Sequence, residues 1–101
     1  MVIIMDNILE ELLYHEAIKV NGIKYQFNKF IEESTELNLE IIKMLKDNNQ
    51  LLLCSHNSNL ISEIVDVEIV VQCLKKLVNN KLYEQIKEEK LNKLLSQLEN
   101  K

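Results

Sequence analysis

Apolar side chains recur along this chain in steps of three and four, the spacing that places them on one face of an α-helix. Four stretches keep this spacing, and polar clusters separate them. Asp6 or Asn7 is expected to cap the first helix, and Asn21 and Gly22 to end it. We predict helices at about residues 6–20, 23–46, 59–77 and 82–98.

The segment between the second and third helices interrupts this pattern. It reads DNNQLLLCSHNSN over residues 47–59 and is polar at both ends. We predict a long connection here that packs back on the helices.

Each predicted helix carries an apolar stripe, which indicates that the four helices pack as a bundle. The third helix is apolar around most of its circumference, so we expect it to be the most buried. The stripes are, in order, Ile8, Leu9, Leu12, Leu13 and Ala17; Ile23, Phe27, Phe30, Ser34, Leu37, Ile41 and Met44; Leu60, Ile64, Val67, Val71, Leu74 and Val78; and Leu82, Ile86, Leu91, Leu94, Leu95 and Leu98.

Composition favours an all-α fold. The chain has no Pro, a single Gly, few aromatic residues and 47% hydrophobic residues, so strand and turn signals are nearly absent. No linker or change of composition divides it, and we expect one domain over residues 1–101. A domain of this length builds only a marginal core, which favours self-association.

The charge bears on the possible partners. The net charge is −4 and all twelve basic residues are lysines, so the guanidinium groups that commonly grip phosphates and base edges are missing. We therefore expect no nucleic-acid binding. No apolar run reaches the ~18 residues of a membrane helix, so we expect no membrane partner either.

The cysteines and histidines suggest no chemistry of their own. Cys54 and Cys73 stand in no metal-binding pattern, and MVIIMDNILEELL turns acidic too early for a signal peptide. We expect a cytoplasmic protein whose free thiols pack as small hydrophobes. Neither His15 nor His56 has a Glu three residues before it, which argues against a ferritin-like di-iron bundle.

Carboxylates mark the candidate site. Glu33 and Glu36 on the second helix, and Glu63 and Asp66 on the third, are the only acidic pairs three residues apart. This spacing puts both members of a pair on one helix face. If the two helices run antiparallel, four carboxylates converge, and a hard divalent cation such as Mg²⁺ or Mn²⁺ relieves their repulsion.

Two simpler readings remain open. Acidic residues near a helix N-terminus are favoured by the helix dipole, which would account for Glu63 and Asp66. Glu33 and Glu36 would equally suit a solvated face with nearby lysines.

The segments FNKFIEESTELNLEIIK and ISEIVDVEIVVQCLKKL resemble the all-α nucleoside triphosphate pyrophosphohydrolases, the MazG-like superfamily that includes dimeric dUTPases and phosphoribosyl-ATP pyrophosphatase. The family pattern is ExxE, a spacer and ExxD, and Glu33, Glu36, Glu63 and Asp66 match it. The closing EEKLNKLLSQLE is similar to the charged last helix of small phage-type members. The resemblance covers about residues 25–98, although Ser62 stands where members often have a further Glu.

The resemblance implies a four-helix MazG-like bundle, with the second and third helices forming the metal-binding hairpin. It also implies Mg²⁺-dependent hydrolysis of a nucleoside triphosphate to its monophosphate and pyrophosphate, with the four acids as metal ligands. It further implies a homodimer or homotetramer in which a neighbouring subunit helps to close the base pocket.

Flanking residues supply candidates for contacts with the substrate. Lys29 and Lys43 are positioned to steer phosphate, or are ordinary surface lysines. Tyr25, Phe27 and Phe30 are candidates for the wall of the base site, while Phe27 and Phe30 also fit the bundle stripe.

Two alternative functions remain. One is a binding protein that holds a nucleotide or another protein on the same scaffold without turnover. The other is a structural helical oligomer whose acids serve solubility.

Overall fold

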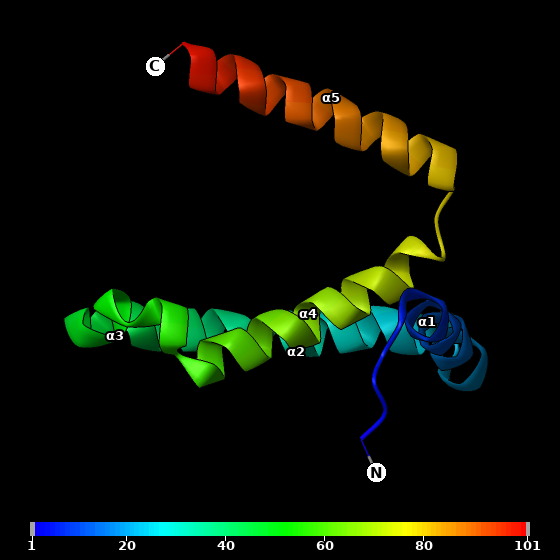
Figure 1. The fold of residues 1–101 in the computed structure, drawn as a ribbon, viewed down its shortest axis with the longest axis horizontal. Helices are drawn as coiled ribbons and strands as arrows, with labels where there is room; N and C mark the ends of the chain where they lie inside the picture. Colours follow the sequence, from blue (N-terminus) through cyan, green and yellow to red (C-terminus); the bar gives the residue numbers. More distant parts are fainter. Residues whose placement is uncertain (1, 101) are drawn as a thin grey trace.

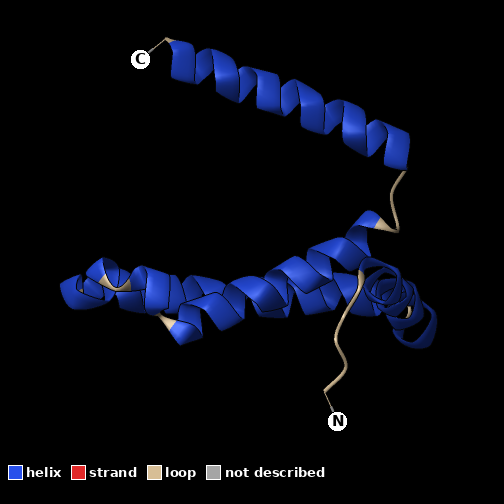
Figure 2. Cartoon of the chain, viewed as in Figure 1, coloured by secondary structure: helices blue, strands red, loops and turns tan. Residues whose placement is uncertain are grey.

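The computed structural model describes residues 2–100, and these contain helices and no strand (Figure 2). The all-α prediction is therefore confirmed for this part of the chain. No helix within it is both long and apolar enough to cross a membrane. The elements are α1 (Asn7–Asn21), α2 (Ile23–Lys46), α3 (Asn48–Leu52), the 3₁₀ helix η1 (Cys54–His56), α4 (Ser58–Lys75) and α5 (Asn80–Glu99).

The antiparallel pair α2 and α4 forms the centre of the fold (Figure 1). Helix α1 packs across one end of this hairpin and touches both members, whereas α3 packs against α2 at the other end. The predicted hairpin of the second and third long helices is thus present as a pair of packed helices.

The junction between α1 and α2 follows the sequence prediction. The carboxylate of Asp6 caps α1 by accepting a hydrogen bond from the backbone N–H of Leu9 at 2.8 Å. Gly22 ends α1 with φ of +86° and ψ of 170°, a backbone region that is essentially restricted to glycine. The sharp turn at Gly22 lets α1 cross α2, and the side chain of Gln26 donates to the carbonyl of Ala17 at 3.2 Å.

The connection over residues 47–57 differs from the predicted loop, because much of it is helical. The carboxylate of Asp47 accepts hydrogen bonds from the backbone N–H groups of Asn49 (2.9 Å) and Gln50 (3.4 Å), which starts α3. Asn57 caps α4 in the same way, accepting from the N–H of Leu60 at 3.1 Å. A helix as short as α3 has no room for an apolar repeat, so periodicity could not reveal it.

The core is small, and α4 supplies most of it, as expected. Its apolar members are Tyr14, Leu60, Val70 and Cys73, of which all but Tyr14 belong to α4. The polar side chains of Gln26 and Glu33 are buried beside them.

Several predicted stripe positions are wrong. Ile64 of α4 and Val78, which follows the end of α4, are exposed. Ile23 and Phe27 of α2 are exposed as well. Val70 and Cys73 on α4 and Gln26 on α2 are the buried positions instead. On α1 the buried position is Tyr14. The α1 stripe residues that are exposed are Ile8, Leu12 and Leu13.

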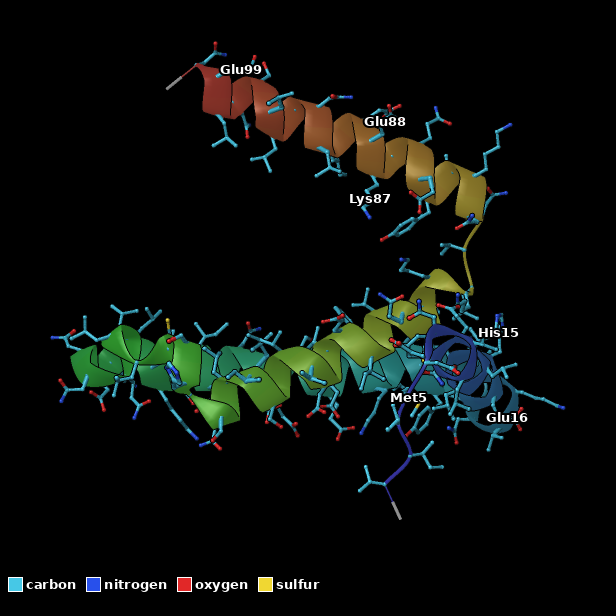
Figure 3. The ribbon with its side chains drawn as sticks, viewed as in Figure 1. Met5, His15, Glu16, Lys87, Glu88 and Glu99 are labelled. Atoms are coloured by element: carbon cyan, nitrogen blue, oxygen red, sulfur yellow. The ribbon has the colours of Figure 1, made fainter. Side chains whose placement is uncertain are left out.

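Helix α5 stands apart from the other helices (Figures 1 and 3). Its apolar residues Leu82, Leu91, Leu94, Leu95 and Leu98 are each about half exposed or more. The single chain therefore does not close the expected four-helix bundle. An apolar helix face of this kind normally packs against another apolar surface.

Candidate metal centre

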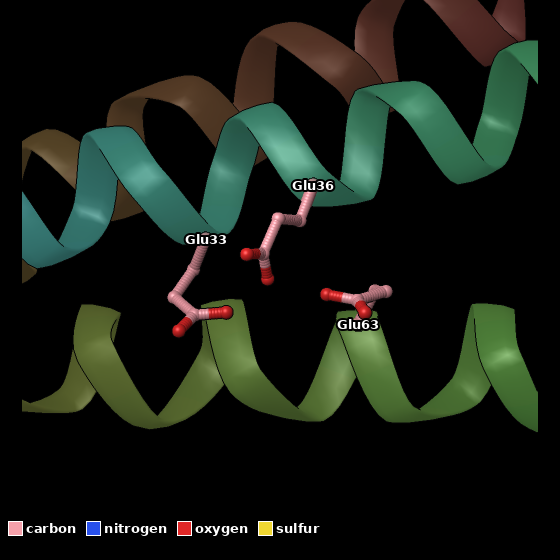
Figure 4. A group of neighbouring side chains, drawn as sticks. All are labelled: Glu33, Glu36 and Glu63. Carbon is pink, nitrogen blue, oxygen red and sulfur yellow. The ribbon is translucent and has the colours of Figure 1, made fainter.

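Three carboxylates meet across the hairpin formed by α2 and α4 (Figure 4). Glu33 and Glu36 project from adjacent turns of α2, and Glu63 projects from α4 towards them. Each offers one oxygen, and these three oxygens lie within 4.8 Å of one another. We call Glu33, Glu36 and Glu63 the acidic cluster.

Two oxygens of the acidic cluster are buried without a partner. Glu33 is only 7% exposed, although it sits on a helix whose neighbouring Glu32 faces solvent. Glu63 is half-buried. The Oε2 atoms of Glu33 and Glu63 find no hydrogen-bond donor among residues 2–100. Leaving a polar atom unpaired in a buried position is costly, and a cation is one kind of ligand that these oxygens could hold.

Lys29 partly compensates the acidic cluster. Its Nζ lies 3.0 Å from Oε1 of Glu33 and 3.4 Å from Oε1 of Glu32. The hydrogen bond to Glu33 is the main reason why the pKa of Lys29 is raised, with the charges of both glutamates adding to it. One lysine balances one of the three charges, so the acidic cluster stays negative.

The raised pKa of Glu36 reflects the repulsion among the three carboxylates. Repulsion from Glu33 is the largest cause of its raised pKa, followed by desolvation and by the charge of Glu63. Glu36 is itself exposed, so it can turn towards a cation entering from solvent. These carboxylates could hold a divalent ion, whose charge would offset their repulsion.

The fourth predicted ligand lies nearby but is not part of the acidic cluster. Asp66 is half-buried and follows Glu63 by three residues on α4. Glu33, Glu36 and Glu63 are thus brought together by the fold, while Asp66 borders them on the same helix face.

The predicted substrate contacts are spread over α2. Lys43 is exposed, with its Nζ 3.9 Å from Oε2 of Glu40. Tyr25 and Phe27 are about half exposed and Phe30 is half-buried. A role for these four residues in binding phosphate or base stays a prediction.

The cysteines and histidines take no part in the acidic cluster. Cys73 is buried as expected, and burial raises the pKa of its thiol. Cys54 is exposed, contrary to prediction, because η1 places it on the outside of the connection. His15 projects from α1 (Figure 3), and His56 Nδ1 lies 2.9 Å from the hydroxyl of Ser55.

Sequence reasoning missed a polar cavity beside the acidic cluster. This cavity, of about 510 Å³, opens where α2 passes into α3 and η1 leads into α4. No sequence signal marks it, because it exists only when residues 47–57 fold back as α3 and η1. Its lining consists of Glu40, Lys43, Met44, Asp47, Gln50, Leu53, His56, Asn57, Ser58 and Asn59.

The chain matches no family model, no curated protein and no solved structure.

Proposed function

We propose that the protein is a Mg²⁺-dependent nucleoside triphosphate pyrophosphohydrolase that releases pyrophosphate and the monophosphate. The observation that supports this most is the acidic cluster, in which Glu33 and Glu63 hold buried oxygens with no partner. The match of Glu33, Glu36, Glu63 and Asp66 to the ExxE and ExxD motifs of the MazG-like enzymes adds the reaction class.

The proposed ligand set joins two packed helices, α2 and α4. Glu33 and Glu63 present fixed, buried oxygens, Glu36 closes from the solvent side, and Asp66 extends the set along α4. All-oxygen ligation of this kind suits Mg²⁺, with Mn²⁺ as a substitute. When bound, the metal neutralises the triphosphate and lowers the pKa of the attacking water.

Lys29 has a role in this proposal as a movable cation. It pairs with Glu33 in the structure, and its side chain remains partly open to solvent. With the charge of Glu33 balanced by a bound metal ion, the ammonium group of Lys29 would be free to contact a phosphate oxygen. The carboxylates would thus hold the metal, while the Lys29 side chain would move from Glu33 to the substrate.

We propose that a second copy of the chain covers the exposed apolar residues of α5. Leu94 and Leu98 are 48% and 61% exposed, and such contiguous apolar surface usually marks an interface. The length of the chain favours the same conclusion. Light scattering coupled to gel filtration is expected to report a dimer or tetramer, and Leu94→Lys is expected to shift it towards the monomer. A monomeric wild type would refute this part.

Both cysteines are free and Cys54 is exposed. This supports a cytoplasmic site of action, because exposed thiols persist in a reducing compartment.

The hydrolase is tested by measuring pyrophosphate release from ribo- and deoxyribonucleoside triphosphates with Mg²⁺ or Mn²⁺. We expect release to stop with EDTA and to fall at least about a hundredfold in Glu36→Gln, since even partners outside the ligand set commonly cost 10–100-fold. Glu16→Gln, the same change at an exposed position on α1, is the matched control and should retain activity.

One negative result would change the conclusion. A folded wild type that releases no pyrophosphate from any triphosphate, yet still binds Mg²⁺ and nucleotide, would favour a binding protein on the same scaffold.

A further inference from the structure

The polar cavity described above is placed to share a ligand with the acidic cluster. Glu40 follows Glu36 by four residues on α2, and Asn59 precedes Glu63 by four on α4. Four residues advance a helix by ~6 Å, so the cavity begins about one turn beyond the acidic cluster. A volume of about 510 Å³ suits a small molecule.

The charges in the cavity disfavour phosphate. Glu40 and Asp47 place two carboxylates in its lining, and Lys43 lies close to one of them, 3.9 Å from Oε2 of Glu40. A polyanion would meet more negative than positive charge there. An uncharged group that has both apolar surface and hydrogen-bonding edges fits better, because Met44 and Leu53 line the same cavity.

Side-chain amides supply the hydrogen-bonding groups, and two of them are held in place. Oε1 of Gln50 accepts a hydrogen bond from Nδ2 of Asn57 at 3.2 Å, which leaves the NH₂ group of Gln50 to donate to a ligand. Asn57 is fixed in turn by capping α4. Asn59 adds a third amide in the first turn of α4. Asn and Gln amides pair readily with the edges of nucleobases.

We propose that this cavity binds the nucleoside part of the nucleotide whose phosphates are held at the acidic cluster. Gln50 and Asn59 contact the base, Met44 and Leu53 cover its faces, and the carboxylate of Glu40 accepts from sugar hydroxyls. This inference rests on the proposed function, and it moves the base from the side of Tyr25 and Phe27 to the opposite end of the hairpin.

The test compares inorganic tripolyphosphate with α,β-imido analogues of the common nucleoside triphosphates, titrated calorimetrically with Mg²⁺. We expect at least one analogue to bind about tenfold or more tightly than tripolyphosphate. Asn59→Leu should remove this preference and leave tripolyphosphate binding unchanged. Gln50→Leu should also reduce it. Asn38→Leu, the same change on an exposed part of α2 outside the cavity, should behave as the wild type.

The outcomes separate the two proposals. Equal affinity for tripolyphosphate and every analogue would overturn the nucleoside assignment while leaving a phosphate-binding centre. The nucleoside assignment would also be overturned if Asn59→Leu and Gln50→Leu, both folded, kept the preference of the wild type for the analogue. If neither ligand binds in the presence of Mg²⁺, the hydrolase and the nucleoside assignment fail together. Circular dichroism of each variant confirms that its helices are intact.

Discussion

Neutralising Glu63 should stabilise the protein in the absence of metal and strongly reduce its stabilisation by Mg²⁺. Glu63→Gln keeps the size of the side chain but removes a charge that faces Glu33 and Glu36 within 4.8 Å. At that distance two like charges repel by ~0.9 kcal/mol in water and by ~3.5 kcal/mol at an effective dielectric constant of 20. The exposure of Glu36 and the pairing of Glu33 with Lys29 both favour the lower value.

With two such repulsions removed, the free energy of unfolding in EDTA should rise by about 1–2 kcal/mol. For a domain of this size that corresponds to roughly 5–10 °C in Tm. Magnesium should reverse the order of stability, so that the wild type becomes more stable than Glu63→Gln. If Mg²⁺ binds as proposed, at a hundred times its Kd it should add ~2.7 kcal/mol to the free energy of unfolding of the wild type, whereas the variant lacks one ligand and should gain far less.

The assay is urea unfolding followed by circular dichroism, in EDTA and in Mg²⁺, at matched ionic strength and one protein concentration. Glu16→Gln, on the exposed side of α1, should match the wild type in both buffers. The reasoning is refuted if Glu63→Gln is less stable than the wild type in EDTA. It is equally refuted if Mg²⁺ stabilises both proteins to the same extent.

Three further predictions concern packing, the helix junction and one titrating group. Leu60→Ala removes a side chain that is 8% exposed and should lower the free energy of unfolding in urea by about 2–5 kcal/mol. Leu52→Ala, at a position that is 82% exposed, should change it little. Similar losses in both variants would contradict the assigned core. Gly22→Ala should cost about 1–3 kcal/mol through φ of +86° alone, since a Cβ there meets nothing within 4 Å, and a neutral result would contradict the turn. The hydrogen bond to Glu10 and burial raise the pKa of Tyr14 to about 12. In the unfolded chain tyrosines ionise near pH ~10, whereas Tyr14 keeps its proton to higher pH in the folded protein. The contribution of Tyr14 to the free energy of unfolding should therefore be complete below pH ~10 and be lost as the pH rises to about 12. Ultraviolet titration should show a late phenolate step that is missing in Tyr14→Phe.

The long helices could be predicted from the sequence because each keeps its apolar repeat over several turns. The bounds of α2 agree with prediction, and Asp6 and Gly22 mark the ends of α1 as their side-chain chemistry suggests. The inward faces were harder to predict. Tyr14, Gln26 and Glu33 are buried although a hydrophobic pattern ranks them as surface residues. Which face turns inward depends on how α1 crosses the hairpin, and this is set by tertiary contacts rather than by periodicity.

The candidate site was predictable in part for a similar reason. The three-residue spacing places Glu33 and Glu36 on one face, and it needs only an antiparallel neighbour to bring Glu63 to them. The cavity could not be predicted from the sequence, because it depends on a five-residue helix whose cap, Asp47, lies in a polar segment without a periodic pattern. The position of α5 was also beyond reach, since an apolar stripe does not say whether its partner belongs to the same chain.

The separation of α5 links helix content to the number of copies in solution. Most helical stability in proteins comes from packing of an apolar face, and twenty residues without such packing are only modestly helical in water. If a second copy covers α5, dilution unwinds it, and the ellipticity at 222 nm falls as the copies part. Helix content then reports on self-association, and the chain contains less helix at low protein concentration than at high concentration.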